Sequence, residues 1–509
     1  MSQALALHRS RSRWADLGLA LTLAAVAWTA PLLAVALAVV WLVVAYGVSR
    51  PGRWLAVLTW ALPFHILAMA VLFGGFGLPG PLVRVIAGWK ELTVVLLLLA
   101  TALRAASGRG PRVAVSAVDV AVVGLALLAA TYLLAATPLL GADIPVKAQL
   151  YGFRDTVFFT ALYFVGRGSP EVNDGDAALK RLFAVGVITS VIAVAERLFV
   201  TPQMLVVMGA TSYFNDFLGV AAMTAGNEFG LPDNYWTMMG GRFVQRAGSV
   251  YLSSQGFATP FLVIMPAATA LLLRRAAAPS RVAWTLGYAL LWAALLLSIT
   301  RMTLFACLIQ LLLLATLYRR WGVLATAAIA SVVALLAGMV ASPGLASLVW
   351  ETLTWQSGSS VSHVKDWAAG ARAVWDQPLG SGLGTTDQTA VRFGVTPLTA
   401  DNLYLKYAVE LGIAGLIAYL AVVGGAARAA HGLFRTGMQE SDRALGACML
   451  AAILGVTING MTTALYNHMV LSYVLFWLVG TTVTLSQRRA RYESGGADPG
   501  QGPPGASAP

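Results

Sequence analysis

Residues 256–273 read GFATPFLVIMPAATALLL and contain no charged side chain. A stretch of this length and composition forms a helix that can cross the roughly 30 Å hydrocarbon core of a bilayer. Similar runs recur along most of the 509 residues, of which 58% are hydrophobic and 11% charged, and the mean hydropathy is +0.74. A soluble domain carries about 25% charged residues. The sequence therefore predicts an all-α integral membrane protein and excludes a soluble globular enzyme.

The apolar runs predict about 14 transmembrane helices. They lie at 14–30, 31–48, 54–75, 89–104, 116–136, 151–166, 181–200, 256–273, 282–299, 302–318, 322–341, 403–424, 443–463 and 467–486. The run at 151–166 is short and contains Arg154 and Asp155, so it is the weakest of the set. No internal repeat of the kind that many transporters show is evident.

The positive charge indicates the orientation of the chain. Its net charge is +12, and most Lys and Arg residues stand in short segments between apolar runs. Cytoplasmic loops are enriched in these residues, so the pattern places both termini in the cytoplasm. Membrane topology accounts for the charge, and we expect no nucleic-acid partner.

Two long segments, 201–255 and 342–402, then fall on the outer side, where we expect them to form ordered loops that carry short helices. The predicted division is a transmembrane bundle at 1–200, the first outer loop at 201–255, central helices at 256–341, the second outer loop at 342–402, C-terminal helices at 403–490 and a disordered tail at 491–509. The tail is rich in Gly, Pro, Ser and Ala, a composition that is typical of disorder.

The second outer loop ends in the most informative motifs of the chain. The segment 378–385 reads PLGSGLGT, 401–405 reads DNLYL, and 410–416 reads ELGIAGL. Glycines permit tight turns and let the backbone approach a ligand or another segment closely. The glycine run does not follow a strand or open a nucleotide-binding helix, so a phosphate-binding loop is not supported.

These three motifs, in this order, resemble the signature of the O-antigen ligase/polymerase superfamily. The resemblance covers 363–420. It implies a multispan glycosyltransferase of the GT-C type, which transfers sugar chains from an undecaprenyl-diphosphate carrier at the outer face of the cytoplasmic membrane. In the ligases a histidine typically precedes the asparagine, whereas Asp401 stands there in this sequence. The resemblance is therefore closer to bacterial surface-polysaccharide polymerases.

Two arginines match the contexts in which the superfamily binds the diphosphate. Arg246 precedes a span in an R-x-G context, and Arg301 occupies a short outer turn in an S-x-x-R context. A guanidinium can hold phosphate oxygens in a bidentate fork. The alternative is that each arginine only anchors its helix at the level of the lipid headgroups.

Asp401 is the candidate base, because a buried carboxylate can remove a proton from the acceptor sugar hydroxyl. An N-cap of the following helix is the alternative role. Glu410 lies about two turns deeper, and we expect it to pair with an arginine or a backbone group. The remaining candidate substrate-binding residues are Arg154, Arg242, His363, Lys365, Asn402 and Tyr404.

The sequence thus predicts a polymerase that joins lipid-linked oligosaccharide repeats without a cofactor or metal, since no Asp-x-Asp pair stands in the outer loops. The expected partners are a lipid-linked donor, a lipid-linked acceptor, membrane lipids, and chain-length regulators or other polysaccharide-assembly proteins. One alternative is a ligase that transfers the glycan to lipid A core or protein. Another is a transporter or flippase, which would predict repeat symmetry and broken helices at the midplane.

Overall fold

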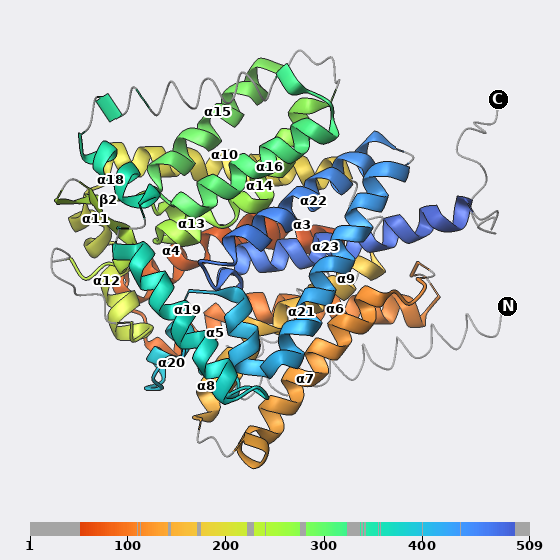
Figure 1. Ribbon diagram of the computed structural model, residues 1–509, viewed down its shortest axis with the longest axis horizontal. Coiled ribbons are helices and arrows are strands. Elements are labelled where there is room, and N and C mark those ends of the chain that lie inside the picture. The colour runs from red at the N-terminus through yellow and green to blue at the C-terminus, as the bar shows by residue number, and fades with distance from the viewer. Residues whose placement is uncertain are drawn as a thin grey trace, which may run out of the picture.

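A computed structural model describes residues 51–493 of the chain, apart from 109, 112, 141–143, 170–174, 221–228, 240, 275–280, 323–335, 337–338, 341–342, 355, 357, 400 and 438 (Figure 1). The predicted spans at 14–30 and 31–48, most of 322–341, and the predicted disordered tail from 494 onward lie outside the described residues.

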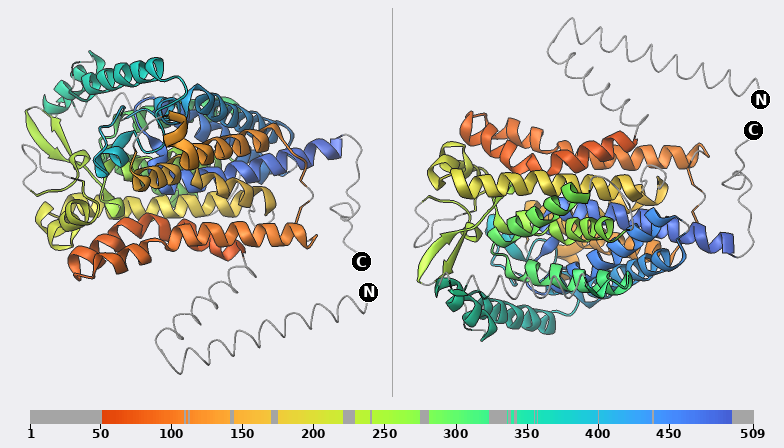
Figure 2. Two further views of the ribbon diagram at one scale, coloured as in Figure 1. Left: turned by 90° about the horizontal axis from the view of Figure 1, so that it is seen from below. Right: turned by 90° about the horizontal axis from the view of Figure 1, so that it is seen from above.

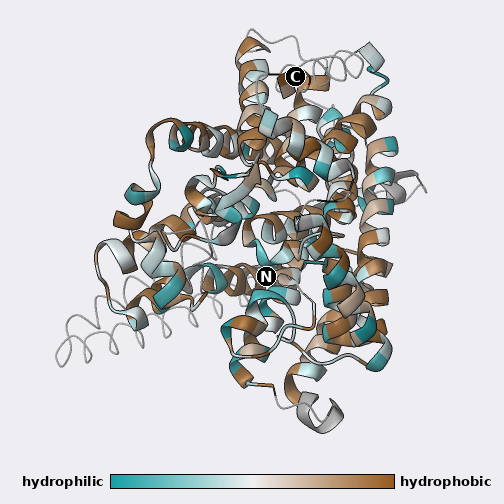
Figure 3. Cartoon of the chain, turned by 60° about the vertical axis from the view of Figure 1, so that its left-hand side comes forward, coloured by the Kyte–Doolittle hydropathy of each residue, from teal (hydrophilic) through white to brown (hydrophobic). Residues whose placement is uncertain are grey.

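The described part of the chain is a bundle of helices. The bundle helices are α3 (Pro51–Ala61), η1 (Leu62–Phe64), α4 (His65–Ala70), η2 (Val71–Gly75), α5 (Gly80–Ala87), α6 (Trp89–Ala106), α7 (Ala117–Leu140), α8 (Val146–Thr156), η3 (Phe158–Thr160), α9 (Ala161–Gly168), α10 (Gly175–Phe199), α13 (Ser254–Ala258), α14 (Phe261–Leu273), α15 (Arg281–Leu297), α16 (Arg301–Leu317), α21 (Leu403–Thr436), α22 (Glu440–Asn459), η8 (Leu465–Asn467) and α23 (Met469–Glu493). Hydrophobic residues occupy most of the length of the long helices (Figure 3).

Seven helical segments among the described residues are long and apolar enough to cross a membrane. They are Trp54–Gly75, Ala117–Ala135, Gly175–Phe199, Ser254–Leu273, Leu403–Thr436, Glu440–Asn459 and Met469–Arg488, and each overlaps a predicted span. Shorter apolar helices cover Val282–Leu297 and Arg301–Leu317, again at predicted positions. The mostly helical fold is therefore confirmed, while the total of about 14 spans stays a prediction.

One predicted span differs in form. Residues 151–166 do not make a continuous helix, because α8 ends at Thr156 and Val157 has φ −137°. The short turn η3 and then α9 follow. The polar residues of the segment lie on α8, before the break, while α9 packs against α6 and α23.

The centre of the bundle is α14, together with the preceding α13. The span Ser254–Leu273 is 89% buried within the protein and packs against α10, α16 and α22. Small residues bring the neighbouring helices close: a Cβ added at Gly446 of α22 would lie 2.5 Å from the backbone nitrogen of Phe434 in α21. In a membrane, helices associate through such close packing, because lipid tails are as apolar as the side chains.

The two ends of the bundle differ. At one end, Arg167 pairs with Asp119, and Arg274 pairs with Asp176. This is the end that the basic loops predict to be cytoplasmic. The hairpin of the first long segment, together with helices from both long segments, lies at the other end, away from the C-terminal end of α23 (Figure 2).

The first long segment contains a β-hairpin, which the all-helical expectation missed. Its elements are α11 (Pro202–Val207), α12 (Ala210–Ser212), η5 (Tyr213–Phe217), η6 (Asp233–Tyr235), β1 (Trp236–Met239), β2 (Arg242–Gln245) and η7 (Ser249–Tyr251). The strands pair antiparallel, with Trp236 opposite Gln245 and Met239 opposite Arg242. Gly241, with φ +76°, supplies the left-handed conformation at the turn.

The second long segment is helical. It contains α18 (Pro343–Leu353), α19 (Gly358–Asp376) and α20 (Asp387–Arg392), and α19 packs against α21. The DNLYL motif follows these helices, and α21 starts within the motif, at Leu403. The two long segments therefore contain short helices and one hairpin, while their place outside the membrane stays a prediction.

Candidate functional site

Arg246 follows strand β2 and lies against the turn between α15 and α16. Its Nε donates to the backbone oxygen of Ser298 at 2.8 Å, and its Nη2 donates to Oγ1 of Thr300 at 2.9 Å. These acceptors are neutral, so they orient the guanidinium without cancelling its charge. Burial and the nearby charge of Arg301 lower the pKa of Arg246 to about 10, and the group remains a cation at neutral pH.

Glu196, at the end of α10, fixes the segment that carries Arg246. It accepts hydrogen bonds from the backbone nitrogens of Gly248 at 3.1 Å and Ser249 at 2.5 Å, and from the hydroxyl of Tyr235. The backbone nitrogen of Arg246 in turn donates to the oxygen of Tyr235 at 2.7 Å. The sequence analysis did not identify these hydrogen bonds of Glu196. An acid near the end of an apolar helix nevertheless indicates that the acid has a bonding partner.

Arg301 begins α16, immediately after that turn. Its Nη1 donates to Oγ1 of Thr352 in α18 at 2.6 Å, and its charge acts on both Arg246 and His363. Arg301 therefore stands where the α15–α16 turn, α18 and α19 meet. The charge of Glu351 in α18 also acts on Arg301, so two cations and one acid influence one another in this region.

His363, on which Arg301 acts, belongs to a group with two aspartates. His363 and Asp366 stand one turn apart on α19, and Asp401 precedes α21. A ligating atom from each of the three lies within 4.8 Å of the others. Burial and, second, the charge of Asp366 raise the pKa of Asp401 to about 6. Burial lowers the pKa of His363, with Arg301 acting in the same direction, so its imidazole is neutral near pH 7.

The N-cap of α21 is Asn402 and not Asp401. Its Oδ1 accepts hydrogen bonds from the backbone nitrogens of Tyr404 and Leu405, both at 2.9 Å, and its Nδ2 donates to the oxygen of Met461 at 3.0 Å. The suggestion that Asp401 caps this helix is therefore wrong. Because Asn402 performs that task, the carboxylate of Asp401 is available for chemistry.

The structure thus connects four predicted residues in a chain, in which Arg301 acts on Arg246 and on His363, and His363 lies beside Asp401 and the additional Asp366. We call these five the outer charge cluster, after the side of the membrane that the sequence predicts for them. The other candidates lie in different surroundings. Arg242 is exposed on the hairpin, Lys365 is exposed on α19, Tyr404 donates through its hydroxyl to the oxygen of Thr457, Glu410 is fully buried, and Arg154 pairs with Asp155 and lies over the ring of Tyr151.

The glycine-rich run 378–385 docks into a break in α21. Gly412 has φ +72° and ψ −176°, which interrupts the helix, and a Cβ there would lie 2.5 Å from the oxygen of Leu379. The nitrogen of Ser381 donates to the oxygen of Val409 at 2.6 Å, and that of Ile413 donates to the oxygen of Pro378 at 3.0 Å. The glycines therefore let the loop satisfy the backbone groups that the break would leave unbonded.

A second set of charges lies beneath this loop. We call Thr386, Asp387, Lys406 and Glu410 the buried ion network. Lys406 Nζ lies 2.8 Å from Asp387 Oδ2 and 3.5 Å from Glu410 Oε1, and Thr386 donates to Glu410 at 2.5 Å. Glu410 also accepts from the hydroxyl of Thr156 and the nitrogen of Gly384. It therefore pairs with a backbone group as expected, but its cation is a lysine and not an arginine.

Of the described residues, His363, Asp366 and Asp401 form a set that could hold a metal ion. An imidazole and two carboxylates are suitable donors. The neighbouring guanidiniums of Arg246 and Arg301 repel a cation, however. The arrangement therefore suits an anionic substrate beside a base better than it suits a bound metal.

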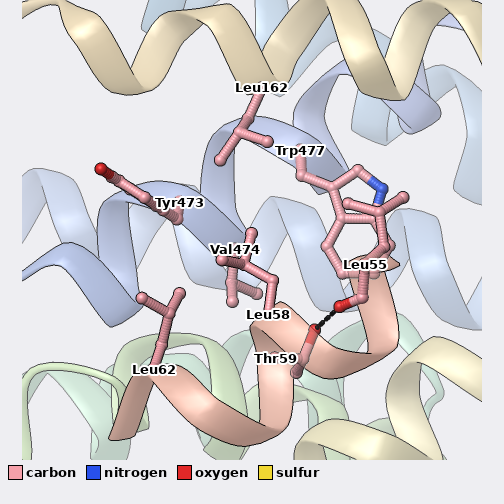
Figure 4. A pocket seen from close by; sticks show the side chains of 8 residues that line it. All are labelled: Leu55, Leu58, Thr59, Leu62, Leu162, Tyr473, Val474 and Trp477. Carbon is pink, nitrogen blue, oxygen red and sulfur yellow. Dashed lines mark hydrogen bonds between the residues drawn. The ribbon is translucent and has the colours of Figure 1, made fainter. Parts of the chain in front are cut away.

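A small apolar space lies between α3, η1, α9 and α23 (Figure 4). Its empty volume is about 190 Å³, and its lining includes Leu62, Leu162, Tyr473 and Trp477. Ligand pockets usually measure about 300–1,000 Å³. No part of this space is wide enough for a water molecule, so it is a packing gap between helices and not a ligand pocket.

In the comparison with known families, residues 286–420 match the family model for O-antigen ligase. The matched segment starts in α15 and ends in α21, so it contains Arg301, α19, the glycine-rich loop and Asp401. Arg246 lies before it. Comparison with curated proteins finds no match to the chain. The family match confirms the resemblance to the O-antigen ligase/polymerase superfamily, whose members are glycosyltransferase-like enzymes of polysaccharide assembly.

Proposed function

We propose that this protein, which carries an O-antigen ligase family domain at 286–420, is a polymerase of surface polysaccharide. It joins oligosaccharide repeats that are linked to undecaprenyl diphosphate, at the outer face of the cytoplasmic membrane. The observation that carries the proposal is the chain of neighbours in the outer charge cluster: Arg301 acts on Arg246 and on His363, and His363 lies beside the protonatable carboxylate of Asp401.

The reaction is a direct displacement at the anomeric carbon of the donor. The oxygen of an acceptor sugar hydroxyl forms a bond to that carbon, while the bond from the carbon to the diphosphate oxygen breaks with its electron pair. Asp401 takes the hydroxyl proton, and the lipid diphosphate leaves as an anion. A base is most effective when its pKa lies near the working pH, and the raised pKa of Asp401, about 6, meets that condition.

Arg246 and Arg301 bind the departing diphosphate. Negative charge on the bridging oxygen grows as the bond breaks, so fixed cations stabilise the transition state more than the bound donor. The hydrogen bonds from Arg246 to Ser298 and Thr300, and from Arg301 to Thr352, hold both guanidiniums in place before the substrate arrives. Preorganised groups of this kind contribute most when they need not reorient during the reaction.

The decisive experiment compares the surface glycan of cells that lack the gene with that of cells complemented by the wild type or by Arg301→Ala. We expect the wild type to restore a ladder of increasing repeat number on a gel. Arg301→Ala should give at least about a hundredfold less polymer at unchanged membrane abundance, because a fixed transition-state contact is lost.

Arg320→Ala is the matched control, since Arg320 is an exposed arginine just beyond the other end of α16. It should leave the ladder unchanged. Normal polymer from Arg301→Ala would show that Arg301 does not bind the departing diphosphate. A single capped conjugate in place of a ladder would identify a ligase, and loss of lipid-linked precursor at the outer face would identify a transporter.

A further inference from the structure

The exposed side of helix α19 carries a line of apolar residues, which we call the α19 stripe. All of its members are exposed and are spaced by three or four residues, so they share one face of the helix: Val361, Val364, Ala368, Ala371 and Trp375. The side chain of Trp375 is 86% exposed. Apolar side chains gathered on one surface in this way indicate a contact with another molecule or with a membrane.

The opposite side of α19 is fixed on the protein. Gly370 is buried there, and a Cβ added to it would lie 2.9 Å from Cδ1 of Leu405 in α21. His363 and Asp366 also lie on this side, since they reach Asp401. The helix thus packs against α21 with one side and is open on the other, along one edge of the bundle in the left view of Figure 2, where it is drawn in teal.

A hydrogen bond sets the depth of the C-terminal end of α19. The backbone oxygen of Leu379 accepts from the hydroxyl of Tyr132 in α7. Tyr132 lies within the apolar span Ala117–Ala135, about 4.5 Å from its end. Trp375 precedes Leu379 by four residues and is therefore at most about 13 Å from it. The exposed tryptophan thus lies close to the level at which a membrane span ends.

An exposed apolar face of α21 reaches the same place. The nitrogen of Ile413 donates to the oxygen of Pro378 at 3.0 Å. Ile413, Ile417 and Leu420 are all exposed, and their spacing places them on one face of the apolar span Leu403–Thr436. Such a face of a membrane span contacts lipid. The lipid-facing surface of α21 therefore extends to the residues that follow α19.

Two cations border the α19 stripe. Lys365 and Arg372 are exposed, and each directly follows a member of the stripe. Seven residues are about two turns, so both lie along the same side of the stripe. Asp376, at the last position of α19, is the exposed acid of the helix. Long cationic side chains beside an apolar surface can keep their charges at lipid headgroups while the apolar residues enter the membrane.

We propose that the α19 stripe binds the outer surface of the lipid bilayer. Trp375 and Val364 lie between the lipids, and Lys365 and Arg372 contact lipid phosphates. Helix α19 then lies in the plane of the membrane, as amphipathic interfacial helices do, and tryptophan is enriched at that level. The depth of Leu379 and the adjoining face of α21 favour a lipid surface over a protein partner.

The membrane contact has a consequence for the outer charge cluster. His363 and Asp366 lie on the opposite side of the same helix, so α19 holds them next to the headgroup layer. The diphosphate of a lipid-linked donor lies in that layer, because its alkyl chain is in the membrane. This consequence rests on the proposed function, whereas the binding of α19 to lipid does not.

The test measures the depth of nitroxide labels on the full chain, reconstituted in vesicles of phosphatidylcholine and phosphatidylglycerol. The labels are attached to Val364→Cys and Trp375→Cys. We expect both to collide mainly with oxygen, which dissolves in lipid, from a depth of about 5–10 Å below the headgroup surface. Ser362→Cys is the matched control, since Ser362 is exposed on α19 away from the stripe, and its label should collide mainly with an aqueous nickel chelate.

Cys307 and Cys448 are buried, so the wild type should take up no label. Labels at Val364→Cys and Trp375→Cys that respond to the nickel chelate as the Ser362→Cys label does would overturn the proposal. Labels shielded from both oxygen and chelate would also overturn it, because a second copy or another protein would then cover the stripe. Val364→Cys carries the test if Trp375→Cys does not fold.

The two cations are tested with the label at Val364→Cys. Replacing both by Lys365→Gln and Arg372→Gln should move this label toward water in vesicles that contain phosphatidylglycerol, because the attraction to lipid phosphate is lost. An unchanged depth would overturn the contact of these cations with lipid. Depth is measured without turnover, so these results are independent of the polymer ladder.

Discussion

The outer charge cluster and the buried ion network use the same kinds of residue for different purposes. In the buried network, Lys406 lies 2.8 Å from Asp387 and is almost completely enclosed. In the outer cluster, Arg246 donates to backbone and hydroxyl oxygens. The charge of Lys406 is neutralised within the protein, whereas that of Arg246 is oriented but not neutralised by these partners.

This difference separates a structural charge from a functional one. A buried charge without a counter-ion is costly, so Lys406, Asp387 and Glu410 exist as a set and hold the second outer loop on α21. The outer cluster instead keeps like charges together, Arg246 beside Arg301 and Asp366 beside Asp401. Such pairs oppose folding stability and are typical of sites that bind or transform a ligand.

Asp401→Asn gives the largest expected effect. The variant keeps the shape of the side chain and cannot disturb the helix cap, because Asn402 provides it. We expect the transfer rate to fall by about 10²–10⁴-fold, as a base is removed, with no decrease in the thermal unfolding temperature, because repulsion from Asp366 is relieved. Both are measured on purified protein with lipid-linked repeats as substrate. Retention of most activity would exclude Asp401 as the base.

Lys406→Met tests the structural role of the buried ion network. It leaves the carboxylates of Asp387 and Glu410 buried without their cation, and we expect about 3–5 kcal/mol less stability. Thermal unfolding in detergent and membrane abundance measure this loss. Lys147→Met is the control, since Lys147 is exposed on α8. A stable Lys406→Met protein that only loses transfer activity would place the network in the catalytic site instead.

Asp366→Asn gives the smallest effect and sharpens the assignment of the base. Asp401 acts in its ionised form, so transfer should decline as the pH falls through its pKa of about 6. Asp366 contributes to that raised pKa, and its removal should move the decline to lower pH by up to about one unit. The pH profile of the transfer rate measures the shift. An unchanged profile would show that the decline reports another group.

Much of the outer site can be predicted from local patterns. Arg246 and Arg301 stand next to apolar runs, where a cation indicates a functional role. The glycines of PLGSGLGT predict that the backbone approaches another segment closely. The loop indeed contacts another segment, α21. Asp366 could not be identified in this way, because it gains its role from the approach of α19 to Asp401, which are far apart in sequence.

Other features depend on the tertiary structure. The hairpin β1–β2 consists of two four-residue strands, which are too short to give a clear alternating pattern. Lys406 and Glu410 are four residues apart on one helix, a spacing that does indicate a pair. Asp387, the third charge, reaches them only because the glycine-rich loop enters the break at Gly412.

That break also divides the longest helix in the part of the chain that the structure describes. As one continuous helix, the 34 residues of α21 would extend about 51 Å, well beyond the roughly 30 Å hydrocarbon core. Residues 413–436 alone extend about 36 Å and are sufficient to cross it. The outer piece, 403–411, is therefore free to leave the helix axis and lie toward the headgroup region. Gly412 thus divides α21 into a longer part, 413–436, which can cross the membrane, and a shorter part, 403–411. Lys406 and Glu410 belong to the shorter part.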